Sequence, residues 1–368
     1  MHIDTITMAR ARLAMREAVR YHLFDPNVGL VDFGHPEHDG QIAWNELAVR
    51  IHVKKKLDQP ALEMASARGM TSPIPPFIGG FPTDVPEGTY RPHATGWGGW
   101  WSPRAPNLHQ SLNTPMHGGI SISDEFHNAA GTLGAKVIDR ATGASMILSN
   151  WHVLVAEWTA RPGQRIYQPG RLDGGTFANV IATLTRDAMS VNIDAAVATL
   201  TGSRDLMSDQ LELGAVTGVG QATLGMEVTK SGRTSGVTSG VVTAIQGTAK
   251  ITYSSGIARL IRGVVTIEPR FGFGQVSAPG DSGSLWIDPE TKQGVGLHFA
   301  GSDFPERGLA IDLLSVLDAL NVDLAIDRPP VAARSFTPAP ATRGAPATRG
   351  TPAAVQHVGR QEEELVMR

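Results

Sequence analysis

The chain has 368 residues, with 32 Lys and Arg residues against 35 Asp and Glu residues and a net charge of −3 at pH 7. This length allows about two domains, and the balanced charge without a basic block argues against a nucleic-acid partner. The sequence has no cysteine, no apolar run of about 18 residues and no signal-peptide pattern at its start. These features exclude disulfide bonds and predict a cytoplasmic protein without a membrane partner.

The first 90 residues predict a small α+β domain. Val28–Phe33 and Leu47–Val53 have the pattern of strands, and the cluster Lys54–Lys56 predicts a solvated strand end. A helix over residues 5–24, capped by Asp4 or Thr5, is indicated by apolar residues at near-helical spacing: Ile6, Ala9, Leu13, Ala14, Ala18 and Leu23. This domain has no clustered acid and base groups, so we expect a role in regulation or assembly.

Three further segments follow. Residues 91–116 are rich in Gly, Pro and Trp, and Trp97, Trp100 and Trp101 predict an ordered linker that lies against a domain surface. Residues 117–326 show short β-branched runs broken by Gly, as in all-β barrels, with one helix expected over 309–320. Residues 327–368 form a Pro/Ala-rich tract that predicts a disordered tail.

The turn Pro279–Ser284 carries a candidate nucleophile. Ser282 follows Asp281 and is flanked by glycines, which let the backbone bend so that the N–H groups of Gly280 and Ser282 converge on one point. Such an arrangement forms an oxyanion hole beside an activated hydroxyl. Without partners upstream, the same residues would equally suit a surface turn.

Two upstream residues supply those partners. His152 ends an apolar, strand-like run, and Asp194 lies inside a second one. A buried carboxylate requires a hydrogen-bonding partner, and a histidine Nδ1–H is a suitable one. The residues therefore predict a catalytic triad in the chain order His152, Asp194, Ser282.

This order and its surroundings resemble the trypsin/chymotrypsin-like serine proteases. Lys230–Gly240 and Gly294–Ser302 are similar to the strand pair and the substrate-pairing strand of small bacterial members, and Gly118–Ser121 is similar to a cytosolic bacterial and plant narrow-leaf-type group. The resemblance implies a mainly β, double six-stranded barrel and a serine endopeptidase that hydrolyses proteins or peptides through an acyl-enzyme, without a cofactor. It also implies a homo-oligomer. Two residues depart from the pattern: Trp151 precedes the histidine, and Ser284 replaces a glycine.

The resemblance also implies which residues bind substrate. They are His298, Phe299, Ala300 and Gly301 of the strand after the nucleophile, and Val276, at the position of the pocket acid in trypsin-like enzymes. An apolar residue there argues against selection of Lys or Arg. His298 either packs locally or selects the residue before the scissile bond, and in the second case we expect cleavage after Glu, Gln or a medium apolar residue.

A second function remains open. Trp151, Ser284 and the added amino-terminal region are compatible with a protease-fold interaction module of weak or no activity, and esterase chemistry is a third alternative. The sequence shows no metal-ligand spacing and no phosphate-binding loop.

Overall fold

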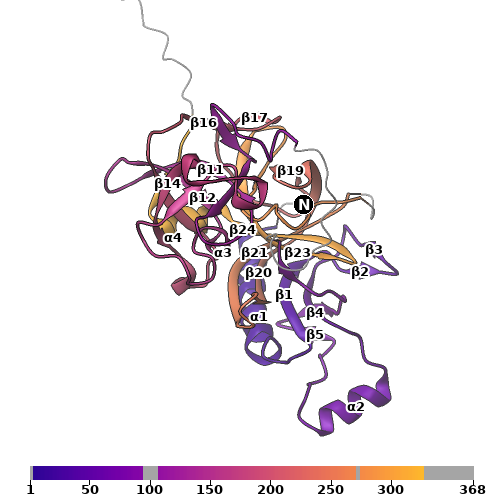
Figure 1. Ribbon diagram of the computed structural model, residues 1–368. Helices are drawn as coiled ribbons and strands as arrows, with labels where there is room; N and C mark the ends of the chain where they lie inside the picture. The colour runs from indigo at the N-terminus through magenta and orange to yellow at the C-terminus, as the bar shows by residue number, and fades with distance from the viewer. Residues whose placement is uncertain (1–2, 94–106, 271–273, 327–368) are drawn as a thin grey trace, which may run out of the picture. The chain divides into compact units, whose positions relative to one another are not determined.

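A computed structural model describes residues 3–93, 107–270 and 274–326. In these ranges strands predominate, which confirms the mainly β architecture, and two large sheets account for most of them (Figure 1). The predicted tail and the three linker tryptophans lie outside the described residues.

The first sheet is formed by residues from the middle of the chain. Its strand order is β10-β9-β13-β14-β15-β12-β11-β25, and all recorded pairings within it are antiparallel. Its eight described strands are β9 (Ser121–Asp124), β10 (Gly131–Thr132), β11 (Ala135–Asp139), β12 (Ser145–Ser149), β13 (Arg165–Tyr167), β14 (Val180–Asp187), β15 (Ala196–Leu200) and β25 (Val322–Leu324).

The second sheet joins the end of the folded region to its beginning. Its main path is β19-β22-β23-β24-β21-β20-β1-β4-β6-β5, and β7 and β18 both pair with β23. Its twelve described strands are β1 (Val28–Gly34), β4 (Ala48–Val53), β5 (Phe77–Ile78), β6 (Phe81–Asp84), β7 (Arg91–Pro92), β18 (Gly218–Val219), β19 (Glu227–Gly232), β20 (Gly236–Thr252), β21 (Ala258–Glu268), β22 (Leu285–Ile287), β23 (Gln293–Asp303) and β24 (Glu306–Asp312).

Smaller elements complete the described fold. Three short strands form a third sheet, and two form a hairpin: β8 (Met116–Gly118), β16 (Leu206–Gln210) and β17 (Gly214–Ala215), then β2 (Glu37–His38) and β3 (Gln41–Ile42). The helices are α1 (Thr5–His22), α2 (Gln59–Ala67), α3 (Trp151–Leu154), α4 (Leu313–Leu320) and three 3₁₀ turns, η1 (Arg171–Asp173), η2 (Phe177–Asn179) and η3 (Met189–Val191).

The boundary expected near residue 90 does not separate two compact units. Strand β1 pairs antiparallel with β20, with Leu30 opposite Ala249, and Met1–Asp327 form a single compact unit. The amino-terminal strands therefore extend the second sheet instead of folding apart from it. A role for residues 1–90 in regulation or assembly stays a prediction.

Helix α1 lies at the predicted place but buries a different face. Asp4 caps it by accepting hydrogen bonds from the N–H groups of Ile6 and Thr7. The buried side chains are Ala11, Ala14, Met15, Ala18 and His22, while Ile6 and Leu13 are exposed. The helix packs against β1 and β4, and three of its five buried residues are alanines, whose small side chains let a helix approach a sheet closely.

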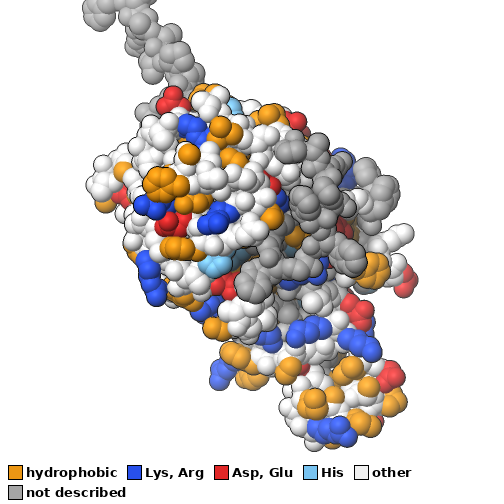
Figure 2. Space-filling view, in the orientation of Figure 1, with side chains coloured by type: hydrophobic (Ala, Val, Ile, Leu, Met, Phe, Trp, Pro, Cys, Tyr) orange, Lys and Arg blue, Asp and Glu red, His pale blue; other side chains and the backbone are white. Residues whose placement is uncertain are grey.

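Helix α4 is shorter than predicted. Residues 309–312 belong to β24, and the helix begins at Leu313, where the Asp312 carboxylate accepts a hydrogen bond from the N–H of Ser315 at 3.0 Å. Helix α2 buries none of its residues and projects away from the two large sheets (Figure 1). In Figure 2, hydrophobic and basic side chains are mixed on the surface at this place.

The largest hydrophobic cluster is shared by the two large sheets. It contains Ile147, Leu148 and Val197 from the first sheet and Leu285 and Leu297 from the second. The strand ends that carry the predicted catalytic residues therefore meet around one core.

Candidate active site

His152 and Asp194 are brought together by the pairing of two strands. Ser149 at the end of β12 lies opposite Ala196 at the start of β15, so the residues just outside this pair are neighbours. His152 Nδ1 lies 2.6 Å from Asp194 Oδ2, and the His152 backbone N–H donates to Asp194 Oδ1 at 3.1 Å. Both side chains are buried. The carboxylate fixes the proton on Nδ1 and leaves Nε2 of a neutral imidazole free to accept one.

Neutral groups complete the surroundings of Asp194. Tyr253 Oη donates to Asp194 Oδ2 at 2.6 Å, and Asn150 Nδ2 donates to the Asp194 carbonyl at 2.7 Å. Burial and the neighbouring carboxylate raise the pKa of Tyr253 well above its ordinary value, so the phenol remains a donor. Trp151 is 1% exposed and packs on Tyr253 with ring centroids 5.4 Å apart. It therefore supports Tyr253, which holds Asp194 in place.

Ser282 lies in a loop that requires glycine at two positions. Gly280 has φ +107° and Gly283 has φ +98°, and a Cβ on Gly283 would fall 2.1 Å from the carbonyl oxygen of Thr132. The Ser282 hydroxyl donates to the Phe299 carbonyl at 3.2 Å. Among the described residues, His152 Nε2 has no hydrogen-bond partner.

Gly131 lets the nucleophile loop and the His152 helix approach each other. A Cβ on Gly131 would lie 2.5 Å from the Val153 side chain and 3.1 Å from the Ser282 carbonyl oxygen. The segments that carry His152 and Ser282 are therefore close neighbours, although the Ser282 hydroxyl bonds to the Phe299 carbonyl and not to His152.

A buried ion pair fixes the nucleophile loop. Lys230 Nζ lies 2.9 Å from Asp281 Oδ2, and neither side chain is exposed. The N–H groups of Thr234 and Ser235 donate to Asp281 Oδ1. Burial by itself would raise the pKa of Asp281, but Lys230 and the hydrogen bonds from Ser235 outweigh it and hold the pKa well below its ordinary value. Ser284, the other departure from the family pattern, donates to the Asp281 carbonyl within this loop.

The predicted oxyanion hole binds a carbonyl oxygen of the same chain. The N–H groups of Gly280 and Ser282 both donate to the carbonyl oxygen of His93, the latter at 3.3 Å. The His93 N–H in turn donates to the Phe299 carbonyl at 3.3 Å. Two convergent donors at one oxygen are the geometry that stabilises a tetrahedral intermediate.

His298 contacts the side chain of His93. Trp286 Nε1 donates to His298 Nδ1 at 3.4 Å, and His298 Nε2 lies 3.3 Å from His93 Nδ1. An indole N–H only donates, so a neutral His298 carries its proton on Nε2 and donates it to His93. Burial lowers the pKa of His93 to about 4 and also lowers that of His298 well below its ordinary value, which keeps both rings neutral.

The other predicted substrate-binding residues have distinct positions. Phe299 supplies the carbonyl that accepts the His93 N–H, and Ala300 pairs with Pro92. A Cβ on Gly301 would lie 2.2 Å from His93 Cε1, so only glycine leaves room for this ring. Val276 is fully buried in a hydrophobic cluster with Trp286.

Three residues of this site escape prediction from the sequence. Lys230 belongs to a quoted motif, yet its pairing with Asp281 depends on β19 lying next to β22. Tyr253 reaches Asp194 from the end of β20, and nothing near it in the sequence indicates this contact. His93 belongs to the predicted linker, where the preceding proline indicates only extended backbone.

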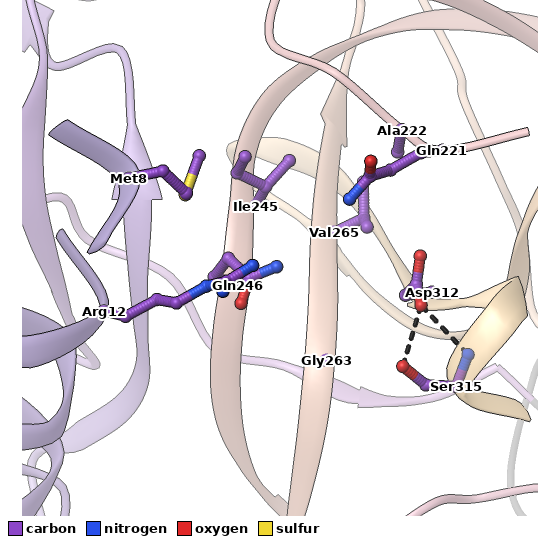
Figure 3. A pocket seen from close by; sticks show the side chains of 10 residues that line it. All are labelled: Met8, Arg12, Gln221, Ala222, Ile245, Gln246, Gly263, Val265, Asp312 and Ser315. Atoms are coloured by element: carbon purple, nitrogen blue, oxygen red, sulfur yellow. Dashed lines mark hydrogen bonds between the residues drawn. The ribbon is translucent and has the colours of Figure 1, made fainter. Parts of the chain in front are cut away.

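A separate cavity of about 130 Å³ lies away from these residues (Figure 3). Arg12 of α1 reaches toward it, and Asp312 accepts the two bonds from Ser315 that cap α4. Its lining residues are Met8, Arg12, Gln221, Ala222, Ile245, Gln246, Gly263, Val265, Asp312 and Ser315. None of them belongs to the predicted triad, so the cavity is not the predicted active site.

Two features are absent from the described residues. In this part of the chain, no helix has both the length and the apolar character needed to cross a membrane. Nor do these residues include a group of three or more His, Asp or Glu side chains that could hold a metal ion.

Comparison with known proteins gives likeness in structure alone. No protein-family model matches the chain, and no curated protein matches it in sequence. A Nocardiopsis protease is 19% identical with a TM-score of 0.43, and the match covers 57% of this chain and 98% of that one. Thermobifida fusca protease A is 16% identical with a TM-score of 0.42 over 57% and 98% of the two chains. A glutamic acid specific serine protease, described as using a histidine triad in substrate binding, is 21% identical with a TM-score of 0.44 over 57% and 100%.

Proposed function

We propose that this protein is a serine endopeptidase that hydrolyses peptide bonds through an acyl-enzyme on Ser282. The single observation that carries the proposal is the convergence of the Gly280 and Ser282 N–H groups on one peptide carbonyl oxygen. The buried His152–Asp194 pair next to the same loop supports it.

In the proposed mechanism, the Ser282 hydroxyl turns from the Phe299 carbonyl toward His152 Nε2. His152 takes the hydroxyl proton as the oxygen attacks the scissile carbonyl, and Asp194 stabilises the imidazolium that forms. The two N–H groups hold the oxyanion, and each such donor contributes about 3 kcal/mol to transition-state stabilisation. His152 then gives its proton to the leaving amine, and water hydrolyses the ester by the reverse roles.

The remaining features of the proposal are those that the sequence indicated. Substrates are proteins or peptides, the compartment is the cytoplasm, and the protein acts as a homo-oligomer without a cofactor. The neutral ring of His93 lies against His298. For the residue before the scissile bond, this contact supports a medium side chain that is uncharged or forms hydrogen bonds. A substrate Lys or Arg next to His298 would be a buried cation, and His298 offers it no opposite charge.

The test is labelling of Ser282 by a fluorophosphonate probe together with hydrolysis of a peptide anilide. Because His93 occupies the cleft, both measurements use the wild type and a His93→Pro variant, which lacks the N–H that Phe299 accepts. We expect labelling and hydrolysis that disappear in Ser282→Ala and persist in Ser203→Ala, a matched change at an exposed serine.

The competing hypothesis is the interaction module. It gains one observation, namely that the Ser282 hydroxyl contacts Phe299 while His152 Nε2 has no partner among the described residues. Tight peptide binding without labelling or hydrolysis, in the wild type and in His93→Pro alike, would favour it. Hydrolysis of esters but not amides would indicate esterase chemistry.

A further inference from the structure

A segment of this chain lies along the strand that the sequence assigns to substrate binding. Strand β7 (Arg91–Pro92) pairs antiparallel with β23, with Pro92 opposite Ala300 and Arg91 opposite Gly301. The next residue, His93, continues the pairing through its N–H bond to the Phe299 carbonyl. An extended peptide that adds a strand to a sheet in this way is a general mode of peptide recognition.

The end of this segment meets the catalytic groups in the orientation of a substrate. The His93 carbonyl oxygen accepts hydrogen bonds from the N–H groups of Gly280 and Ser282. His93 is 1% exposed, and its side chain lies against His298 and Gly301. One residue therefore satisfies the oxyanion hole and the side-chain pocket at once. A loop crossing the cleft at random would not satisfy both.

The residues before His93 are anchored by contacts of their own. Tyr90 is buried, and its hydroxyl lies 2.6 Å from His52 Nδ1. Arg91 forms an ion pair with Asp303 at the end of β23. These contacts keep the segment at a high effective concentration next to Ser282. Its binding is therefore an intramolecular step that does not depend on a collision between two molecules.

From these contacts we infer that the protein is its own substrate and that Ser282 cleaves the chain on the carboxyl side of His93. The inference rests on the proposed function. The Ser282 oxygen bonds to the His93 carbonyl carbon, the bond from that carbon to the next nitrogen breaks, and the departing amine takes the proton held by His152. Water then hydrolyses the ester, which leaves a carboxylate on His93 and a new amino terminus at residue 94.

The two products stay together in the folded protein. Residues 1–93 include β1, which is paired with β20 on one side and β4 on the other. Cleavage therefore yields a nicked protein that elutes as one species under native conditions and separates into two chains only when denatured.

The experiment is mass spectrometry of the purified full-length chain, followed over time under denaturing conditions. We expect the wild type to convert into residues 1–93 and 94–368 at a rate independent of protein concentration. Ser282→Ala remains a single chain, and His93→Pro is not cut at this bond. His38→Ala, a change at an exposed histidine of β2, is cut as the wild type is.

External substrates separate a failure of this inference from a failure of the proposed function. The probe is acetyl-Tyr-Arg-Pro-His-anilide, which carries the sequence of the segment. A wild type that labels at Ser282 and hydrolyses the anilide, yet keeps its own chain intact, overturns self-cleavage and leaves the endopeptidase proposal standing. Absence of labelling and hydrolysis in both the wild type and His93→Pro overturns the two together. Cleavage at the same bond in Ser282→Ala would assign the cut to another protease.

Discussion

Two buried carboxylates on opposite sides of the nucleophile have different kinds of partner. The carboxylate of Asp194, just before β15 of the first sheet, accepts a hydrogen bond from the neutral hydroxyl of Tyr253 and lies next to the imidazole of His152, while Asn150 donates to the backbone carbonyl of Asp194. Asp281, in the loop before β22 of the second sheet, is paired with the ammonium group of Lys230. In the proposed mechanism the first carboxylate supports His152, which exchanges a proton with Ser282. The second carboxylate fixes the loop that carries Ser282.

The difference follows from electrostatics. A permanent cation next to Asp194 would compete with the imidazolium that the proposed mechanism forms on His152, so neutral hydrogen bonds suit that position better. Beside Asp281 a cation is an advantage. Burial favours the neutral forms of both Lys230 and Asp281, but the ammonium group and the hydrogen bonds from Ser235 hold the pKa of Asp281 below its ordinary value and so favour the ionised carboxylate that fixes this loop. The following predictions test this division of roles.

The largest effect is expected from Asp194→Asn. An amide in this position favours the wrong imidazole tautomer, and a loss of about 10⁴-fold in kcat is typical of such a change. The measurement is kcat for the peptide anilide per mole of folded protein. The control is Asp139→Asn, which alters a buried carboxylate paired with Arg186. Because β11 runs antiparallel to β12, Asp139 lies near Ser145, at the end of β12 remote from His152. It should lower stability and leave kcat near that of the wild type; equal losses of kcat in both would refute a special role for Asp194.

A smaller but still large effect is expected from Lys230→Met. This change leaves Asp281 buried without its cation, which typically costs about 3–5 kcal/mol in the free energy of unfolding. Denaturant unfolding measures the stability, and kcat at a temperature where the variant is folded measures the position of the loop. Lys230→Met combined with Asp281→Asn should recover part of the stability, because it removes the uncompensated charge. A double variant no more stable than the single one would argue against the ion pair.

The third prediction concerns pH and the docking of His93. Burial lowers the pKa of His93 to about 4 from 6.5, so docking favours the neutral ring. Docking is therefore complete above about pH 6.5 and weakens as the pH falls toward 4, by at most about tenfold per pH unit. The charged and titratable groups around His93 are His298, Asp281, Asp303, Arg91 and Lys230.

Hydrogen exchange of residues 89–93 measures this docking in the intact Ser282→Ala chain between pH 5 and 8. Protection, corrected for the intrinsic exchange rate, should decline below pH 6.5. In Ser282→Ala combined with His93→Gln, the decline should be absent, since glutamine does not titrate. The same pH dependence in that variant would assign the effect to another group.

The smallest effect is expected from Tyr253→Phe. The change removes one hydrogen bond of 2.6 Å to the Asp194 carboxylate, and such bonds to charged groups contribute about 1.5–3 kcal/mol. We expect a modest fall in kcat together with a shift of the pH profile of kcat/KM. The reason is that the Tyr253 hydroxyl donates to the Asp194 carboxylate, and this carboxylate stabilises the imidazolium of His152 in the proposed mechanism. A fall in stability without any change in the pH profile would limit Tyr253 to packing on Trp151.

The sequence predicted the elements and residues whose signals are local. Strands were predicted at 28–33 and, from alternating apolar residues, at 47–53, and β1 and β4 confirm both. The alternation at 47–53 predicted a half-buried strand, whereas every residue of β4 is buried, because β4 pairs with β1 and β6 inside the second sheet. The glycines around Ser282 predicted a sharp turn, and their positive φ values confirm it. Helix α4 began later than predicted because the Asp312 cap marks its start, and apolar spacing alone does not reveal a cap.

Signals that depend on distant pairing escaped the sequence. The predicted boundary near residue 90 failed because β1 completes its hydrogen bonds with β20, more than 200 residues later. Candidate catalytic residues could be named from the sequence because each sits in a distinctive local motif, whereas His93 and Tyr253 have no such motif. Their roles depend on which strand edges and buried donors lie nearby after folding.

By itself, the sequence determined the mainly β character, the glycine turn at Ser282 and the order His152, Asp194, Ser282, since these depend on neighbouring residues and backbone sterics. Only the tertiary structure decided that Lys230 neutralises Asp281, that Tyr253 supports Asp194, and that the His93 carbonyl fills the oxyanion hole. The physical reason is that a buried charge or an unpaired N–H must find a partner in space, and the chain carries no local record of which distant residue will supply it.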